Sequence, residues 1–286
     1  MNREKITIPR LQQMADINET IICTTCYDYP IGLLLDRAGV HMIMVGDSVG
    51  MVVLGYENTV PVTMEEILHH AKAVVRACKT PFIIGDMPFG SYNSGTELAV
   101  INATRLMKEG GVDGVKVEGG RSVAKTVRSI VEGGIPVMGH IGVTPQTVSQ
   151  LGGYKARGKS IAEAKSLIED ALALEDAGVF ALELECIPVP VSQMISEKLR
   201  VPTIGFGAGP HCDGQGLVLY DVLGLYDKPI PKLSKRYINL SELITNAIET
   251  YISEVLEESF PAPENCFSMP DDDVKLLREQ VAVCRP

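Results

Sequence analysis

The fold of this chain is decided by a stretch that reads HMIMVGD at 41–47, TMEEILHHAKAVVRA at 63–77 and FIIGD at 82–86. The first and third segments are short and almost wholly apolar, which is typical of strands buried on both faces. In the middle segment apolar residues recur at helical spacing, and Thr63 with Glu66 fits a capping box at the start of a helix. A helix between two buried strands predicts a parallel pair with a helical crossover.

The same unit recurs along the chain. Strands are expected at Ile21–Cys26, His41–Val45, Phe82–Ile84, Gly114–Val117, Pro136–Gly139, Phe180–Leu184, Pro202–Phe206 and Leu217–Tyr220. Helices are expected at Pro30–Ala38, Met64–Ala77, Thr96–Glu109, Ser122–Glu132, Ile161–Ala177 and Val191–Leu199, with Gly39, Gly110 and Gly178 as left-handed stops. Eight alternating strands predict an α/β fold, a closed (β/α)8 TIM barrel, with an open doubly wound sheet as the alternative.

The ends of this pattern depart from a simple barrel. An extra helix from Pro9 to about Ala15 is expected to cap the bottom of the barrel. The link at 207–216 is too short for a helical crossover, so either the seventh helix is missing or the last strand is misplaced. Helices at Ser241–Glu258 and Val274–Val283 form an expected C-terminal extension. We treat 1–286 as a single barrel domain, because such barrels routinely reach about 250 residues.

Composition excludes several classes of protein. Of 286 residues 45% are apolar and 22% are charged, a mixture able to form a sizeable core. The 26 basic residues are outnumbered by 36 acidic ones, and the resulting net charge of −10 argues against nucleic-acid or membrane binding. No signal peptide and no long apolar segment is evident, so we expect a cytoplasmic protein.

The cysteines indicate reduced thiols. Seven are scattered along the chain, an odd number that does not fit a secreted disulfide framework. Cys23 and Cys26 have C-x-x-C spacing, but they lie in an expected strand, where residues three apart point to opposite faces. We therefore interpret both as buried thiols without a shared metal or redox role.

Ionisable residues follow almost every expected strand, and in a parallel barrel these ends form the reactive face. They are Asp28, Asp47 with Ser48, Asp86, Lys116 with Glu118, His140, Glu185 and Asp221. A single acid in such a place more often caps the following helix, whereas several converging carboxylates would repel one another unless a cation binds them. The candidate ligands are oxygen donors without a His/Cys cluster at zinc spacing, which favours Mg²⁺.

The candidate metal ligands are Asp47 and Asp86, each directly after a glycine that allows close approach of the backbone. Glu118 is expected to face the same pocket as Lys116, two residues away on the same strand. Mg²⁺ bound by one or two of these carboxylates would complete its octahedron with water and substrate oxygens.

A second set of residues is considered for proton transfer and substrate binding. Glu185 is the candidate general base because it lies nearest the mouth. Glu183 is expected either to point the same way from deeper in the barrel or to face the helices. His140 is expected either to bind a substrate carboxylate or to be part of the core.

The segment GYKARGKS at 153–160 matches the phosphate-binding loop G-x-x-x-x-G-K-[ST]. That loop must follow a buried strand, and the preceding TPQTVSQL at 144–151 has no strand pattern. We interpret the match as accidental, and 152–159 as a basic lid over an anionic ligand. A P-loop nucleotide hydrolase is kept as an alternative.

Seven ordered segments together resemble the ketopantoate hydroxymethyltransferase family of the phosphoenolpyruvate/pyruvate superfamily. They are VGDSVGMVVLGYENTVPVTMEE, GDMPFGSY, VKVEGG, GHIGVTPQ, GGYKARGKS, LECIP and GFGAG, within a likeness that runs from about Thr7 to Phe267. The resemblance implies a (β/α)8 barrel, dependence on Mg²⁺, and transfer of a hydroxymethyl unit from 5,10-methylenetetrahydrofolate to 3-methyl-2-oxobutanoate. The product would be 2-dehydropantoate, a precursor in pantothenate biosynthesis. It also implies a homo-oligomer, typically a decamer.

The resemblance also implies residue roles. The family's metal-binding acids fall on Asp47, Asp86 and Glu118, its oxoacid-binding residues on Asp47, Ser48, Asp86 and Lys116, its proton acceptor on Glu185, and its substrate-side histidine on His140. Glu185 would then form a Mg-stabilised enolate from the oxoacid. The sequence departs from the family pattern at Cys26, Arg157 and Glu183. A Mg-dependent carbon–carbon lyase of the same superfamily and a non-catalytic oxoacid-binding protein remain as alternatives.

Overall fold

The computed structural model describes residues 3–226, 228–229 and 231–282. Its strands are β1 (Ile21–Thr25), β2 (Met42–Val45), β3 (Phe82–Asp86), β4 (Gly114–Glu118), β5 (Val137–Gly142), β6 (Ala181–Glu185), β7 (Thr203–Phe206) and β8 (Gly214–Leu217). They pair in chain order, β8 closes on β1, and all pairings are parallel. The prediction of a closed (β/α)8 TIM barrel is confirmed, and the open sheet is wrong.

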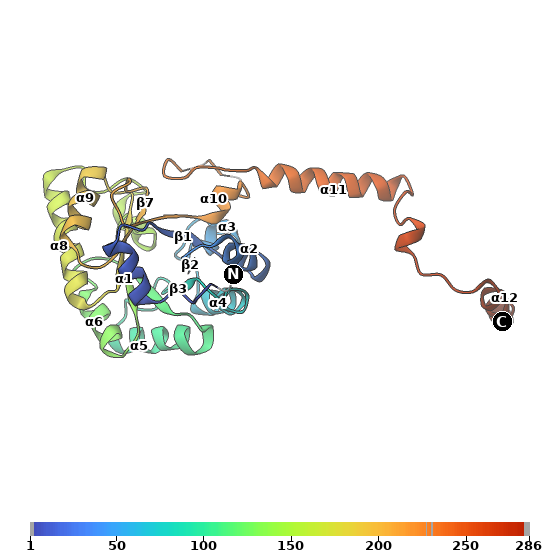
Figure 1. Cartoon of the computed structure of the whole chain (residues 1–286), viewed down its shortest axis with the longest axis horizontal. Helices are drawn as coiled ribbons and strands as arrows, with labels where there is room; N and C mark the ends of the chain where they lie inside the picture. The colour runs from blue at the N-terminus through green and yellow to red at the C-terminus, as the bar shows by residue number, and fades with distance from the viewer. Residues whose placement is uncertain (1–2, 227, 230, 283–286) are drawn as a thin grey trace. The chain divides into compact units, whose positions relative to one another are not determined.

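A helix follows every strand of the barrel except β7 (Figure 1). The helices are α1 (Ile8–Asp16), α2 (Tyr29–Ala38), α3 (Val49–Val52), α4 (Met64–Ala77), α5 (Thr96–Arg105), α6 (Ala124–Glu132), α7 (Val148–Leu151), α8 (Ile161–Ala177), α9 (Val189–Lys198), α10 (Leu219–Leu223), α11 (Leu240–Leu256) and α12 (Asp271–Ala282). Short turns of other helix types lie at η1 (Leu106–Gly110), η2 (Pro145–Thr147) and η3 (Pro263–Asn265). None of the described helices is both long enough and apolar enough to cross a membrane.

The apolar residues form two layers because side chains alternate along each strand. Met42 and Met44 belong to the cluster inside the barrel, which Leu11 and Met14 of α1 join, as expected for a cap at the bottom. The alternate strand residues pack outward against the helices in a second cluster. Cys23 lies in the inner cluster and Cys26 in the outer one, both as free buried thiols, so the interpretation of the C-x-x-C pair is confirmed.

Local signals at helix ends were mostly reliable. Thr63 and Glu66 form the expected capping box of α4. Gly39 and Gly178 have positive φ values of 91° and 95° and end their helices as predicted. The expected stop at Gly110 is wrong by one residue, because the π-turn η1 includes Gly110 and the left-handed residue is Gly111.

The predicted position of the last strand is wrong. We expected it at 217–220, whereas β8 ends at Leu217 and α10 follows at Leu219–Leu223. No helix lies between β7 and β8, where all residues at 207–213 are described. Both suspected irregularities are therefore real: the seventh helix is missing and the strand was misplaced, because GQGL has too few apolar residues to give a strand pattern.

The chain divides into two compact units, Met1–Ile238 and Asn239–Pro286. The first contains the barrel and the second contains α11 and α12, which confirms the expected C-terminal helical extension. Neither α11 nor α12 has a buried residue. The assignment of 1–286 to one domain stays a prediction.

Candidate active site

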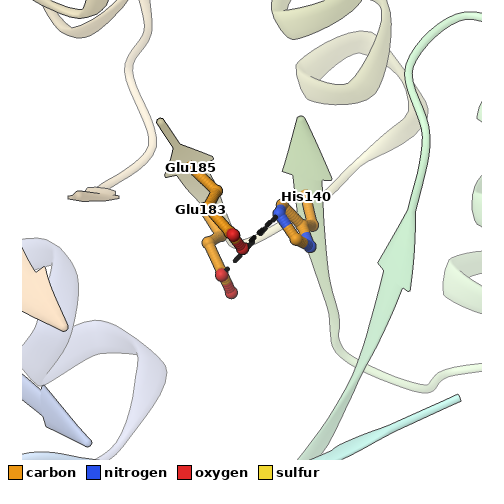
Figure 2. Close-up of side chains that lie close together, drawn as sticks. All are labelled: His140, Glu183 and Glu185. Atoms are coloured by element: carbon orange, nitrogen blue, oxygen red, sulfur yellow. Dashed lines mark ion pairs between the residues drawn. The ribbon is translucent and has the colours of Figure 1, made fainter. Parts of the chain in front are cut away.

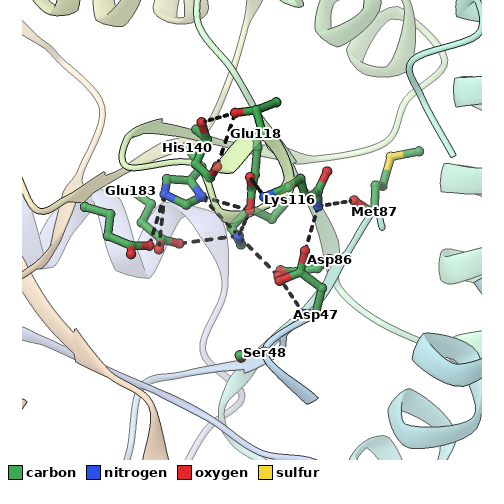
Figure 3. Close-up of polar contacts among 12 residues, drawn as sticks. Asp47, Ser48, Asp86, Met87, Lys116, Glu118, His140 and Glu183 are labelled. Atoms are coloured by element: carbon green, nitrogen blue, oxygen red, sulfur yellow. Dashed lines mark hydrogen bonds and ion pairs between the residues drawn. The ribbon is translucent and has the colours of Figure 1, made fainter. Parts of the chain in front are cut away.

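The register of the strands brings the predicted site residues to the carboxyl end of the barrel. Asp86 pairs with Lys116 across β3 and β4, and Glu118 pairs with His140 across β4 and β5. His140 in turn pairs with Glu183 across β5 and β6. Consecutive partners on adjacent parallel strands point the same way, so their side chains meet in one buried group (Figure 3).

On one side of this group three carboxylates are fixed by protein N–H groups. The Asp47 amide donates to Asp86 Oδ2 at 3.0 Å. Gln146 donates from Nε2 to Asp47 Oδ2 at 2.8 Å and from its backbone N to Glu118 Oε2 at 3.0 Å. Among the described residues, Asp86 Oδ1 and Glu118 Oε1 are buried without a hydrogen-bond partner. Asp86 and Glu118 therefore each have one oxygen held by the protein and one free to bind a ligand.

The carboxylates on this side repel one another. Asp47 is 4% exposed, and its burial together with the charges of Glu118 and Asp86 raises its pKa well above the ordinary value. Burial likewise raises the pKa of Asp86. A divalent cation would relieve this repulsion, so the donor set and its charge fit a hard ion such as Mg²⁺. Asp47, Asp86 and Glu118 are linked through the Asp47 amide and Gln146, but among the described residues the three donor atoms that lie within 4.8 Å of one another belong to His140, Glu183 and Glu185, not to this predicted set.

Lys116 is the buried cation at the centre. Its Nζ lies 3.2 Å from Asp86 Oδ2, 3.8 Å from Glu183 Oε2 and 3.9 Å from Glu118 Oε1. Burial alone would lower the pKa of Lys116, but the charges of these carboxylates outweigh it and raise the pKa. The lysine therefore stays charged inside the barrel.

His140, Glu183 and Glu185 form the other side of the group. His140 Nε2 lies 3.3 Å from Glu185 Oε2 and 3.7 Å from Glu183 Oε1, as Figure 2 shows. Burial would lower the pKa of His140, but the charge of Glu183 and the contacts with the other two glutamates raise it. Glu183 points into the barrel, so its alternative placement against the helices is wrong. Glu185, on the same face, has a side chain 17% exposed and lies nearer the mouth.

Not every predicted residue belongs to this group. Ser48 lies beside it, where its hydroxyl is 2.8 Å from the Tyr27 hydroxyl. Asp28 caps α2 by accepting a hydrogen bond from the Ile31 amide, and Asp221 accepts one from Ser234. The expectation that Asp28 and Asp221 belong to the reactive face is not supported, since both make these local structural contacts.

Gly46, before Asp47, and Gly85, before Asp86, lack a side chain for different steric reasons. A Cβ on Gly46 would lie 3.0 Å from Ser48 Oγ and 3.3 Å from Asp86 Oδ2, so the backbone does approach the site closely. A Cβ on Gly85 would instead meet Leu106 in the outer layer. The argument from close approach therefore holds for VGD and is wrong for IGD.

Comparisons with known proteins agree with this geometry. The profile of the family described as ketopantoate hydroxymethyltransferase matches residues 5–263. The chain is 55% identical over 265 residues to 3-methyl-2-oxobutanoate hydroxymethyltransferase of Moorella thermoacetica, covering 93% of this chain and 98% of that protein. It is 50% identical over 274 residues to the protein of that name from Heliobacterium modesticaldum, covering 96% and 99%.

The chain belongs to the ketopantoate hydroxymethyltransferase family. It is an enzyme of that family, and its fold is shared more widely. A phosphonopyruvate hydrolase complex with oxalate and Mg²⁺ has a TM-score of 0.58 at 10% identity, covering 96% of each chain. A 2,3-dimethylmalate lyase, described as a member of the PEP mutase/isocitrate lyase superfamily, has a TM-score of 0.57 at 13% identity, covering 96% of each chain. At such identities these likenesses show the fold alone.

The loop 152–159 of this ketopantoate hydroxymethyltransferase family member is not a phosphate-binding loop. It follows η2 and α7 rather than a strand, so the required strand–loop–helix context is missing, as expected from the sequence. Within the loop, the Tyr154 hydroxyl donates to Met51 Sδ at 3.8 Å. This contact places Tyr154 beside α3, and burial together with the charges of Asp47 and Glu185 raises the pKa of Tyr154.

Two residues of the site were missed in the sequence. Gln146 holds both Asp47 and Glu118, and Tyr92 donates to Gln146 Oε1 at 2.6 Å. Gln146 lies in GVTPQ, just beyond β5, and its position after a strand end was the available signal. An uncharged amide, however, does not stand out among strand-end residues unless its partners are known.

Proposed function

We propose that this enzyme transfers a hydroxymethyl unit from 5,10-methylenetetrahydrofolate to 3-methyl-2-oxobutanoate, giving 2-dehydropantoate for pantothenate biosynthesis. The observation that carries the proposal is the group of five carboxylates around Lys116 and His140, four of them buried, of which two on one side have an unpartnered oxygen. The excess negative charge of these carboxylates favours binding of a divalent ion. The ion would in turn bind an α-keto acid through a chelate formed by the keto and carboxylate oxygens. The names of the relatives agree with this substrate.

Mg²⁺ is the metal we propose, with Asp47, Asp86 and Glu118 as its protein ligands. When bound it would supply Lewis-acid chemistry, withdrawing charge from the keto oxygen and acidifying the C3 hydrogen of the oxoacid. Asp86 Oδ1 has no hydrogen-bond partner among the described residues and is available to it, as is Glu118 Oε1, which also faces Lys116 Nζ at 3.9 Å and His140 Nδ1 at 3.5 Å. Gln146 keeps Asp47 and Glu118 oriented by its two hydrogen bonds, as outer-shell residues do in metal sites.

The oxoacid is oriented by the cationic and hydroxyl groups of the chain. Lys116 offsets the negative charge that develops on the oxoacid oxygens as C3 loses its proton. Ser48, at the start of α3, is placed to donate a hydrogen bond to the substrate carboxylate while Tyr27 fixes its hydroxyl. His140 supplies a further positive charge on the same side as Glu185.

Glu185 is the proposed proton acceptor. Its carboxylate takes the C3 proton, and the electron pair of the C–H bond then forms the new C–C bond to the one-carbon unit. Water supplies the hydroxyl oxygen, both C–N bonds of the one-carbon unit break, and tetrahydrofolate leaves with its two nitrogens taking up the proton from Glu185 and the proton released by water. Glu185 suits this role because it is the most accessible carboxylate of the group. Its Oε2 also lies 3.3 Å from His140 Nε2, so His140 can exchange a proton with it.

The test is proton exchange at C3 without the folate. The enzyme is incubated with Mg²⁺ and 3-methyl-2-oxobutanoate in D2O, and deuterium uptake at C3 is followed by NMR. Uptake that requires Mg²⁺ is expected, and addition of 5,10-methylenetetrahydrofolate should then yield the hydroxymethyl product. Binding of the oxoacid without exchange would indicate a binding protein, and cleavage of a 2-hydroxy acid such as methylisocitrate would indicate a lyase.

We further propose that the enzyme acts in the cytoplasm as a homo-oligomer, a decamer by resemblance to its family. Support for association comes from α11, where apolar side chains including Leu243, Ile244, Ile248, Tyr251 and Ile252 are between 48% and 53% exposed. Exposed apolar surface of this kind is typical of interaction sites. Light scattering coupled to size exclusion would measure the number of subunits.

A further inference from the structure

His140, Glu183 and Glu185, at the mouth of the barrel, are arranged as the ligands of a metal ion could be. One donor atom from each of His140, Glu183 and Glu185 lies within 4.8 Å of the other two (Figure 2). His140 comes from β5 and both glutamates from β6, and these strands are neighbours in the barrel. The three groups are thus fixed on rigid elements and do not depend on a loop.

An unsatisfied buried nitrogen points into this arrangement. His140 is 1% exposed, and among the described residues its Nε2 has no hydrogen-bond partner, although two carboxylates face it at 3.3 and 3.7 Å. Glu183 is 2% exposed, and its Oε2 has no hydrogen-bond partner either. A buried imidazole nitrogen that faces two carboxylates is stabilised when it binds a proton or a metal ion.

The other ring nitrogen of His140 has a suitable partner for metal binding. A metal at Nε2 requires the ring proton to lie on Nδ1, and Nδ1 is 3.5 Å from Glu118 Oε1. A carboxylate behind a metal-binding histidine is the usual outer-shell arrangement. Lys116 Nζ is 3.3 Å from the same nitrogen and can only donate, so the metal-binding tautomer requires Lys116 to direct its protons to Asp86, its ion-pair partner at 3.2 Å, and to leave Nδ1–H to Glu118.

We propose that His140 Nε2, Glu183 and Glu185 form a second cation site, specific for first-row transition-metal dications such as Zn²⁺ or Co²⁺. One imidazole nitrogen with two carboxylates suits these ions, whereas Mg²⁺ favours the all-oxygen set of Asp47, Asp86 and Glu118. Metal binding requires an unprotonated Nε2, so any proton on that nitrogen passes to solvent as the ion binds. The site lies beside the proposed Mg²⁺ site and shares no ligand with it.

A metal at this site would block proton transfer. It would coordinate Glu185, which could then no longer accept the C3 proton, so transition metals should inhibit exchange even when Mg²⁺ is saturating. This consequence rests on the proposed function, whereas the binding site itself does not. The two are therefore tested by separate measurements.

Binding is tested by titrating Co²⁺ into the Mg²⁺-saturated full chain and recording its visible absorption. We expect one equivalent to bind per chain, with the spectrum of nitrogen and oxygen ligands and no thiolate charge-transfer band. Glu183→Val and the nearly isosteric Glu183→Gln should weaken Co²⁺ binding by more than the ~10–100-fold that loss of an outer-shell partner costs. Glu197→Gln, an exposed position on α9, is the matched control and should bind Co²⁺ as the parent does.

Several outcomes would overturn the site. They are no Co²⁺ binding with Mg²⁺ saturating, a thiolate spectrum, or unchanged affinity in whichever of the two Glu183 variants keeps the circular dichroism of the parent. If Co²⁺ binds and the Glu183 variants lose it, yet C3 exchange in the parent is unaffected by Co²⁺, the site stands and the proposed role of Glu185 fails.

Discussion

The two groups of carboxylates at the mouth of this barrel are held in different ways. Asp47, Asp86 and Glu118 each accept a hydrogen bond from a backbone or amide N–H group. Among the described residues, the side chains of Glu183 and Glu185 have no such donor and contact the cationic groups of the site instead. Oxygens held by N–H donors suit Mg²⁺, which demands strict octahedral geometry, whereas carboxylates that face His140 without such donors can exchange a proton or bind a metal ion that accepts a nitrogen ligand.

Replacing Glu185 by Gln should have the largest effect, because it removes the proposed proton acceptor and keeps the shape of the side chain. We expect C3 deuteration of 3-methyl-2-oxobutanoate to slow by about 10²–10⁴-fold, the usual contribution of a positioned base. NMR in D2O measures the rate.

The matched measurement for Glu185→Gln is Mg²⁺ affinity by calorimetry, which should stay within about threefold of the parent because the metal is assigned to the other side. Retained exchange would exclude Glu185 as the base. Loss of Mg²⁺ binding in this variant would show that the metal site and the proposed base are not independent of each other.

Replacing Gln146 by Ala tests the fixed side. The change removes the hydrogen bond to Asp47 Oδ2 but keeps the backbone donor to Glu118, so the ligands remain present and lose part of their orientation. We expect Mg²⁺ affinity to fall by about 10–100-fold, as for other outer-shell residues. Gln193→Ala on the surface of α9, where the amide contacts only Glu197 in the described structure, should leave the affinity unchanged.

Replacing Asp47 by Asn should stabilise the protein without metal. Asp47 is buried beside Asp86 and Glu118, and an amide removes the repulsion while its oxygen can still accept from Gln146. In EDTA we expect the melting temperature to rise by about 2–4 °C, equivalent to about 1 kcal/mol in a chain of this size. Saturating Mg²⁺ should reverse the order of the two proteins, because the parent gains more binding energy. A variant that is less stable in EDTA would contradict the repulsion.

The sequence predicted the mouth well where the geometry is set by strand periodicity. Lys116 and Glu118, like Glu183 and Glu185, are two residues apart and therefore face the same way on any strand. The closure of the barrel then brought them together, since parallel strands end at one edge. Local pattern and topology were sufficient for Lys116 and Glu118, whereas they left two orientations open for Glu183.

Other features depend on contacts that no local pattern records. Gln146 reaches Asp47 across 99 positions of sequence, through a short helical turn whose direction is set by the packed barrel. Asp28 follows a strand as the site acids do, yet its carboxylate turns to the Ile31 amide and caps α2. Strand ends are the places where an acid can serve either the site or a helix, and the choice depends on the loop that follows.

A carboxylate far from the mouth gives the smallest predicted effect. Asp36 on α2 accepts hydrogen bonds from the Thr80 hydroxyl and from the Lys79 amide, the latter at 2.8 Å. Burial raises the pKa of Asp36, but these bonds and the charge of Arg3 outweigh it, so the pKa lies below the ordinary 3.8. This is the opposite direction to Asp47 and Asp86, because Asp36 has donors in place of like charges.

The sign of its pH dependence follows from linkage. The ionised Asp36 stabilises the fold fully above its unfolded pKa, near 3.8, and this contribution is lost as pH falls through the lower folded value. Asp36→Asn should therefore lower the melting temperature slightly at pH 7, and the difference from the parent should shrink as pH falls below about 4. Thermal melts across pH 3–7 in EDTA would measure it. A difference that grows on acidification would show that Asp36, like the mouth carboxylates, has a raised pKa in the folded state.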